Sequence, residues 1–158
     1  MDFDSAFDTL LGHEGGFSDH PHDTGKQTMW GVTVAVARQH GYEGDMKDLP
    51  VSLAKAIYRK SYWDAVQAES LPSLLRYAVF DAGVNSGPVT AIRWLQEAVG
   101  ATPDGILGPK TLAAVNELSS EGILRRMLAK RLTAMTSMSG WPSFSRGWAR
   151  RIATLLEA

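Results

Sequence analysis

Apolar residues recur at helical spacing along most of the chain. Capping residues, glycines and prolines mark where these apolar runs begin and end. Together they predict helices at residues 3–12, 33–41, 51–63, 71–84, 88–99, 109–118, 120–135 and 145–156. The run from 71 to 84 is apolar on nearly every side, which is typical of a central, buried helix.

A polar segment rich in Gly, Asp, His and Pro separates the first two predicted helices, at residues 15–28. This composition is typical of a loop, and only short extended pieces are expected between residues 15 and 33. The chain contains no internal repeat, low-complexity tract or linker. We therefore expect a single, mainly α domain.

The composition is that of an ordinary globular domain. With 158 residues, of which 44% are hydrophobic, the chain is long enough to bury one core. Its apolar runs are too short for a transmembrane helix, and the acidic stretch from Met1 to Asp8 lacks the features of a secretory signal. The absence of cysteine excludes disulfides and thiolate zinc sites, and the net charge of −1 argues against nucleic-acid binding.

Charge is distributed unevenly along the chain. Residues 1–24 contain six acidic side chains and no Lys or Arg, whereas residues 123–156 contain seven basic side chains and no Asp or Glu. The basic stretch has two interpretations. It is either a solvated helix face or a surface that contacts anionic wall polymers or the outer membrane, through screened electrostatic attraction.

The most informative carboxylate is Glu14, in His13-Glu14-Gly15-Gly16-Phe17 directly after the first predicted helix. Two glycines allow a sharp turn and leave the carboxyl group uncovered, as a general acid requires. Cleavage of a glycosidic bond also needs a carboxylate or a positioned water on the other face of the sugar. Asp19, Asp23 and Thr28 follow in the loop and are candidates, although the aspartates also suit turn formation.

Aromatic residues supply the other chemistry expected of a sugar-binding site. Phe17 or Trp30 would form an apolar wall that raises the pKa of the general acid. Trp30 and Tyr62 are candidates for packing against a pyranose ring, and Asp19 for a polar contact with it. Tyr58 and Trp63 are flanked by apolar residues and are expected to pack in the core.

Two polar segments follow in the second half of the sequence. Asn85 stands where the central helix is predicted to break, and its amide suits an N-acetyl group or a catalytic water; the alternative is a helix C-cap. The segment from Asp104 to Thr111 is a turn followed by a helix start. Backbone requirements explain its glycines and proline, so it predicts no catalysis.

The histidines raise a competing hypothesis. His13, His20 and His22 lie near Glu14 and Asp23, a composition from which zinc could be bound. Their spacing fits no helical two-histidine motif. We therefore expect no metal and no other cofactor, and retain a zinc-dependent wall amidase or peptidase as an alternative function.

Several motifs, taken together, resemble glycoside hydrolase family 108, the muramidases of phages and prophages. In chain order these are Glu14-Gly15-Gly16-Phe17, Asp19-x-Pro21-x-Asp23-x-Gly25, Thr28-x-x-Gly31-Val32-Thr33, Tyr58-x-x-x-Tyr62-Trp63, Phe80-Asp81-x-x-x-Asn85-Ser86-Gly87, Leu95-Gln96, Asp104 to Thr111 and Phe144-x-x-Gly147-Trp148-x-x-Arg151. Phe17 stands where Tyr is usual, and Lys26 stands where a second Gly is common. The resemblance extends over essentially the whole chain.

This resemblance implies a lysozyme-like, mainly helical domain with a Gly-rich active-site loop. It implies hydrolysis of the β-1,4 bond between N-acetylmuramic acid and N-acetylglucosamine, with Glu14 as proton donor. Asp23 and Thr28 are similar in spacing to catalytic residues of other phage-type lysozymes. Residues 1 to about 87 would form the catalytic half, and about 88 to 158 a helical half that resembles a peptidoglycan-binding region.

The resemblance also implies a biological setting. The partner would be bacterial peptidoglycan, reached by a monomeric endolysin that accumulates in the host cytoplasm and passes to the periplasm through a holin pore. The basic C-terminal helices would contact the anionic outer membrane, and no nucleic acid is involved. A non-catalytic peptidoglycan-binding module on the same fold is the remaining alternative.

Overall fold

The computed structural model describes residues 1–12, 16–19 and 27–157. Eight α-helices account for most of these residues, which confirms the mainly α prediction. They are α1 (Phe3–Leu11), α2 (Val34–Gln39), α3 (Val51–Tyr58), α4 (Ser73–Ser86), α5 (Pro88–Val99), α6 (Pro109–Glu117), α7 (Ser120–Thr136) and α8 (Trp141–Glu157). None of these helices combines the length and apolar composition that a membrane-spanning segment needs.

Most of the described helices begin and end within two residues of their predicted limits, and three of the differences have a clear physical cause. The helix predicted at 51–63 changes character at Tyr58 and continues as a π-helical segment, Arg59–Trp63. Helix α4 begins two residues later than predicted because Leu71 precedes Pro72 and is extended, as residues before proline usually are. Helix α8 begins four residues earlier than predicted, since a proline at its second position is compatible with the first helical turn.

The expected extended pieces form a small antiparallel sheet in the order β1 (Phe17–Asp19), β2 (Gln27–Met29) and β3 (Val32–Thr33). Trp30 and Gly31 connect β2 to β3 with positive φ values of 54° and 71°. A two-residue hairpin of type I′ requires positive φ at both central residues, so this connection has the backbone of a tight hairpin.

An aromatic cluster joins α1 to α4 through the π-helical segment. The ring of Trp63 lies 5.6 Å from that of Phe3 and 5.4 Å from that of Phe80, both edge to face. Trp63 is completely buried, and Tyr58 is nearly so. Both residues pack in the core, as their apolar flanks predict.

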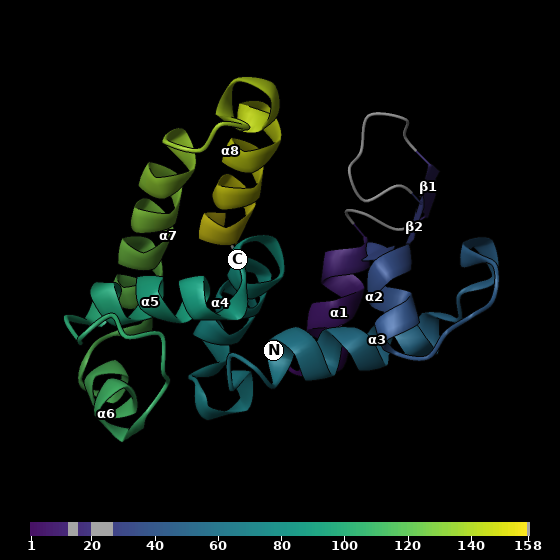
Figure 1. The fold of residues 1–158 in the computed structure, drawn as a ribbon. Helices are drawn as coiled ribbons and strands as arrows, with labels where there is room; N and C mark the ends of the chain where they lie inside the picture. Colours follow the sequence, from purple (N-terminus) through teal and green to yellow (C-terminus); the bar gives the residue numbers. More distant parts are fainter. Residues whose placement is uncertain (13–15, 20–26, 158) are drawn as a thin grey trace.

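Helix α4 occupies the middle of the molecule (Figure 1). The sheet and helices α1–α3 lie on one side of it, and α5–α8 lie on the other. Helix α5 packs along α4, and α7 contacts α4, α5 and α8. The central position predicted for this apolar helix is therefore confirmed, and α4 is placed to contribute side chains to both halves.

A buried glutamine explains the segment from Asp104 to Thr111. The side-chain amide nitrogen of Gln96 donates to Asp104 Oδ1 at 2.7 Å, to the Ile106 carbonyl at 3.0 Å and to Thr111 Oγ1 at 3.1 Å. Its oxygen accepts from the Gly105 amide at 2.8 Å. The turn is thus held from within by α5, which agrees with a structural rather than a catalytic role.

Candidate active site

The predicted general acid follows the end of α1. That helix closes at Gly12, whose amide donates to the carbonyl oxygens of Asp8 and Leu10. Glu14 and Asp23 lie outside the described residues. For Asp19 the structure describes the backbone, which pairs with Gln27 in the hairpin formed by β1 and β2.

Thr28 occupies the middle strand of the sheet. It lies opposite Ser18 on β1 and opposite Thr33 on β3, so three hydroxyl-bearing residues share one face. The other face carries Phe17, Met29 and the buried Val32. The hairpin therefore packs an apolar face on the core and keeps the Thr28 face polar.

Phe17 and Trp30 are both half-buried against the core. The Lys47 ammonium lies 5.3 Å from the centre of the Phe17 ring, a cation–π distance. The indole Nε1 of Trp30 donates to the Leu49 carbonyl at 2.9 Å. This bond sets the orientation of the indole ring at the tip of the hairpin.

Tyr62 is positioned by the π-helical segment. Its ring lies 5.6 Å from that of the buried Tyr58. The Tyr58 hydroxyl in turn approaches Gly31 so closely that a Cβ added there would lie 2.4 Å from it. A side chain at position 31 would require Tyr58 to shift, so the connection between β2 and β3 lies directly against the Tyr58 hydroxyl.

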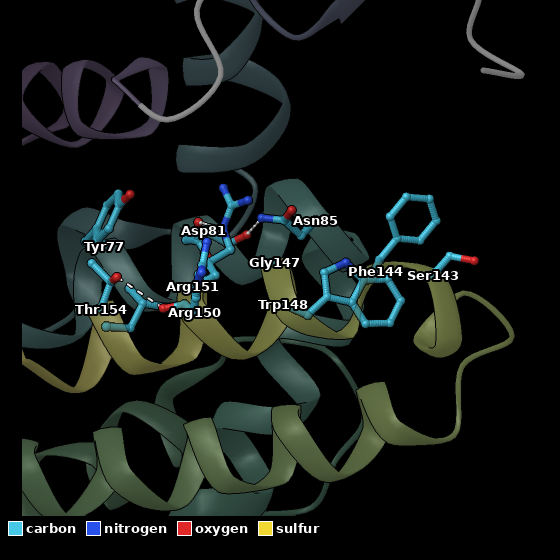
Figure 2. A pocket seen from close by; sticks show the side chains of 11 residues that line it. Tyr77, Asp81, Asn85, Ser143, Phe144, Gly147, Trp148, Arg150, Arg151 and Thr154 are labelled. Atoms are coloured by element: carbon cyan, nitrogen blue, oxygen red, sulfur yellow. Dashed lines mark hydrogen bonds and ion pairs between the residues drawn. The ribbon is translucent and has the colours of Figure 1, made fainter. Parts of the chain in front are cut away.

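Asn85 lies in the last turn of α4, and the helix ends at Gly87. The C-cap interpretation of Asn85 is therefore wrong; its side-chain amide donates within the helix, to the Asp81 carbonyl at 2.7 Å. Asn85 also borders a cavity of about 570 Å³ between α4 and α8 (Figure 2). The position that the sequence assigns to substrate binding thus faces a pocket.

Asp81 lies at the base of this pocket and is almost completely buried. Its Oδ2 accepts from Nη1 of the buried Arg131 at 2.6 Å, and its Oδ1 accepts from Nε of Arg151 at 2.7 Å. A buried carboxylate requires such partners because desolvation strongly disfavours an unpaired charge. The sequence contained the signal, an acid inside the most apolar helix, but did not indicate its partners.

The interpretation of residues 123–156 as a solvated basic face is only partly correct. Two of its seven basic residues, Arg131 and Arg151, are held inside the molecule by Asp81. Two more act between helices, since Arg126 donates to the Ala98 carbonyl at 3.1 Å and Lys130 pairs with Glu97 at 3.2 Å. The stretch is therefore only in part a solvated face.

Residues 7–87 match the family model described as glycosyl hydrolase 108. The chain belongs to glycoside hydrolase family 108. A second model, described as a predicted peptidoglycan domain, matches residues 90–153. The solved structure of SagA from Brucella abortus is similar throughout, with 33% identity and a TM-score of 0.89 over 98% of this chain and 91% of that one. No curated protein matches the chain.

Membership of family 108, together with the peptidoglycan domain, identifies a glycoside hydrolase that acts on peptidoglycan. The pocket in Figure 2 combines both matched regions, because α4 belongs to the first and α8 to the second. Among the described residues no cluster of three potential metal ligands occurs. His13, His20 and His22, which carried the zinc hypothesis, lie outside them.

Proposed function

We propose that this family 108 hydrolase is an N-acetylmuramidase that cleaves the β-1,4 bond between N-acetylmuramic acid and N-acetylglucosamine. The observation that carries this proposal is the family match over residues 7–87, which spans the Glu14 loop and the hairpin. In this mechanism Glu14 holds a proton and transfers it to the departing glycosidic oxygen. Positive charge then develops on the sugar and is relieved by attack of water or of a carboxylate.

The second catalytic group is proposed to come from the same loop and hairpin. Asp23 is our candidate for steadying the developing charge or activating water, with Asp19 as its alternative. Thr28 is the candidate for orienting that water, and its place on the polar face of the hairpin supports this role. A threonine hydroxyl both donates and accepts, which suits the binding of a water molecule.

The glycan is proposed to bind along the residues that border this loop. Trp30 and Tyr62 would pack against sugar faces, with Phe17 supplying the apolar wall beside the acid. Asn85 would bind an N-acetyl group from the opposite side. The fixed indole of Trp30 supports this arrangement, because a ring held in one orientation loses little entropy when a sugar binds.

We further propose that the two matched regions work as one muramidase domain, with α4 shared between them. The resemblance to phage and prophage muramidases supports an endolysin role, in which a monomer reaches the wall after holin-dependent release from the host cytoplasm. Exposed arginines of α7 and α8, such as Arg125, would assist by contacting the anionic outer membrane. Such contact is electrostatic and should weaken with salt.

Digestion of purified sacculi with wild-type protein and with Glu14→Gln tests the catalytic proposal. Mass spectrometry of the wild-type products should reveal new muramic acid reducing ends. Removing the general acid should slow their release by roughly 10²–10⁴-fold. Glu43→Gln is the matched control, because Glu43 is exposed and lies outside any helix or strand, before the segment Met46–Asp48.

Three outcomes would contradict the proposal. Undiminished release of muramic acid ends by Glu14→Gln would exclude Glu14 as the acid. Products cut at the amide between glycan and peptide, formed by an activity that a strong chelator abolishes, would indicate a zinc amidase. Binding to sacculi without any new reducing end would indicate a non-catalytic wall-binding module.

A further inference from the structure

The pocket between α4 and α8 is built from one face of each helix. Tyr77, Asp81 and Asn85 recur every four residues on α4, which places them on one side of that helix. The facing side of α8 contributes Trp148 and Arg151, among others (Figure 2). The cavity of about 570 Å³ lies within the ordinary range for small-molecule sites.

Basic side chains outnumber acidic ones among the described residues that line this pocket. Asp81 is the one acid among the lining residues that the structure describes, and both of its oxygens are occupied by guanidinium groups. Arg150 also lines the pocket, is exposed to solvent and forms no ion pair with any described residue. The Arg150 guanidinium is therefore available to an anionic ligand at this pocket.

A buried guanidinium lies behind the wall of the pocket. Arg131 is completely buried, and its Nε and Nη2 have no hydrogen-bond acceptor among the described residues. Its Nη1 pairs with Asp81 Oδ2, which forms part of the pocket wall. A buried guanidinium with two unpaired donors thus lies directly behind that wall.

Aromatic side chains border the same pocket. The rings of Phe144 and Trp148 are nearly parallel, with centres 6.0 Å apart, and Phe144 is 60% exposed. An exposed phenylalanine beside a half-buried tryptophan is an apolar surface of the kind that carbohydrate and alanyl groups cover. Asn85, on the opposite wall, offers both a donor and an acceptor.

We propose that this pocket binds the muramyl substituent of peptidoglycan, namely the lactyl group and the carboxylate-bearing start of the stem peptide. Arg150 pairs with the peptide carboxylate, and Phe144 and Trp148 cover the lactyl and alanyl methyl groups. This inference rests on the proposed function, because it takes peptidoglycan as the substrate. It assigns to the second half a specific task, which is to distinguish peptide-bearing glycan from glycan without peptide.

Binding of a fragment that the enzyme cannot cleave tests this proposal. The probe is N-acetylmuramyl-L-alanyl-D-glutamine, in which the α-carboxylate is free and the γ-carboxyl is an amide, as it is in the stem peptide. Its partner is the same compound with the α-carboxylate also amidated. Titration calorimetry should show at least tenfold tighter binding of the acid by the wild-type protein. Arg150→Gln should remove that preference. Phe144→Ala should weaken the binding of both compounds several-fold.

Arg146→Gln is the matched control, because Arg146 lies one turn earlier on α8, is exposed and does not line the pocket. It should preserve the preference for the acid. Circular dichroism melting of each variant separates loss of folding from loss of binding. Equal affinity for the acid and the amide, or a preference that survives Arg150→Gln, would overturn the proposal.

This test can fail independently of the proposed function. If sacculi are cut at muramic acid while the fragment does not bind, only the pocket assignment is wrong. If the fragment binds as described while Glu14→Gln retains activity, the catalytic assignment is wrong and the pocket assignment stands. Activity on peptide-free glycan strands provides a third readout, for which Arg150→Gln should leave KM unchanged while raising KM for peptide-bearing strands.

Discussion

Asp81 on α4 and Arg131 on α7 form a fully buried ion pair, with 2.6 Å between Oδ2 and Nη1 and exposed side-chain fractions of 1% and 0%. The same carboxylate accepts from Arg151 on α8 at 2.7 Å. One acid thus connects the central helix to the last two helices. These charged groups lost water contacts on folding. Removing any one of the three side chains therefore leaves a buried charge without its partner.

Replacing Arg131 with methionine should lower the free energy of unfolding by about 3–5 kcal/mol, since it leaves Asp81 buried with one partner fewer. Urea unfolding followed by circular dichroism measures this loss. Lys130→Met is the matched control on the same helix: its pair with Glu97 has side chains about two-fifths exposed (42% and 41%). That control should lose less than about 1 kcal/mol, and equal losses would contradict the role given to the buried pair.

Gly31→Ala should destabilise the protein for two separable reasons. Its φ of 71° costs an L residue about 1–2 kcal/mol, and the new Cβ would lie 2.4 Å from the Tyr58 hydroxyl. Gly41→Ala shares the positive φ, 79°, but meets no atom within 4 Å. The difference in unfolding free energy between the two variants isolates the steric contact, which we expect to add about 1–3 kcal/mol. Equal destabilisation would show that the tyrosine moves aside freely.

Asp104 should make a pH-dependent contribution to stability. The hydrogen bond from the Gln96 side chain, followed by that from the Ile106 amide, lowers the pKa of Asp104 below its ordinary value of 3.8. The folded state therefore holds the carboxylate more firmly than the unfolded state does. The resulting stabilisation is complete above pH 3.8 and is lost as the pH falls through the lower, folded pKa.

Carbon-detected NMR titration measures this pKa directly. Gln96→Met removes the side-chain hydrogen bond that lowers the pKa of Asp104 most, so this pKa should rise toward 3.8. Asp2 serves as an internal control, because Ser5 lowers its pKa at the start of α1, far along the chain from Gln96. An unchanged Asp104 titration in the variant would show that the Ile106 amide alone sustains the shift.

Trp30→Phe tests the hydrogen bond at the tip of the hairpin. Losing the 2.9 Å bond from the indole to Leu49 should cost about 0.5–1.5 kcal/mol of stability. If Trp30 also packs against sugar, KM for glycan strands should rise more than kcat falls, because the ring contacts substrate throughout the reaction. Trp141→Phe, at a half-buried tryptophan on α8, provides the comparison. If neither variant changes KM, Trp30 does not contact the glycan.

Helix positions were predictable where a local signal marks the end. Gly87 and Pro88 separate α4 from α5, and Gly100 ends α5 in the left-handed region at a φ of 76°. The π-helical segment Arg59–Trp63 was not predicted, because its side chains follow an apolar pattern that an α-helix satisfies equally well. Its wider turn is selected by packing of Trp63 between α1 and α4.

The residues of the candidate site were likewise predictable only where the signal is local in the sequence. The sequence by itself identified the motif around Glu14, short extended pieces in the segment that carries Thr28 and Trp30, and a mainly α domain, because each depends on residues close together in the chain. Only the tertiary structure decided that Asp81 pairs with Arg131 and Arg151, which lie 50 and 70 positions later. Helical periodicity predicts which face of a helix a residue occupies, but it does not predict which residue it contacts. That contact is selected because burying an unpaired charge costs free energy. That selection brings two distant motifs together as the walls of one pocket.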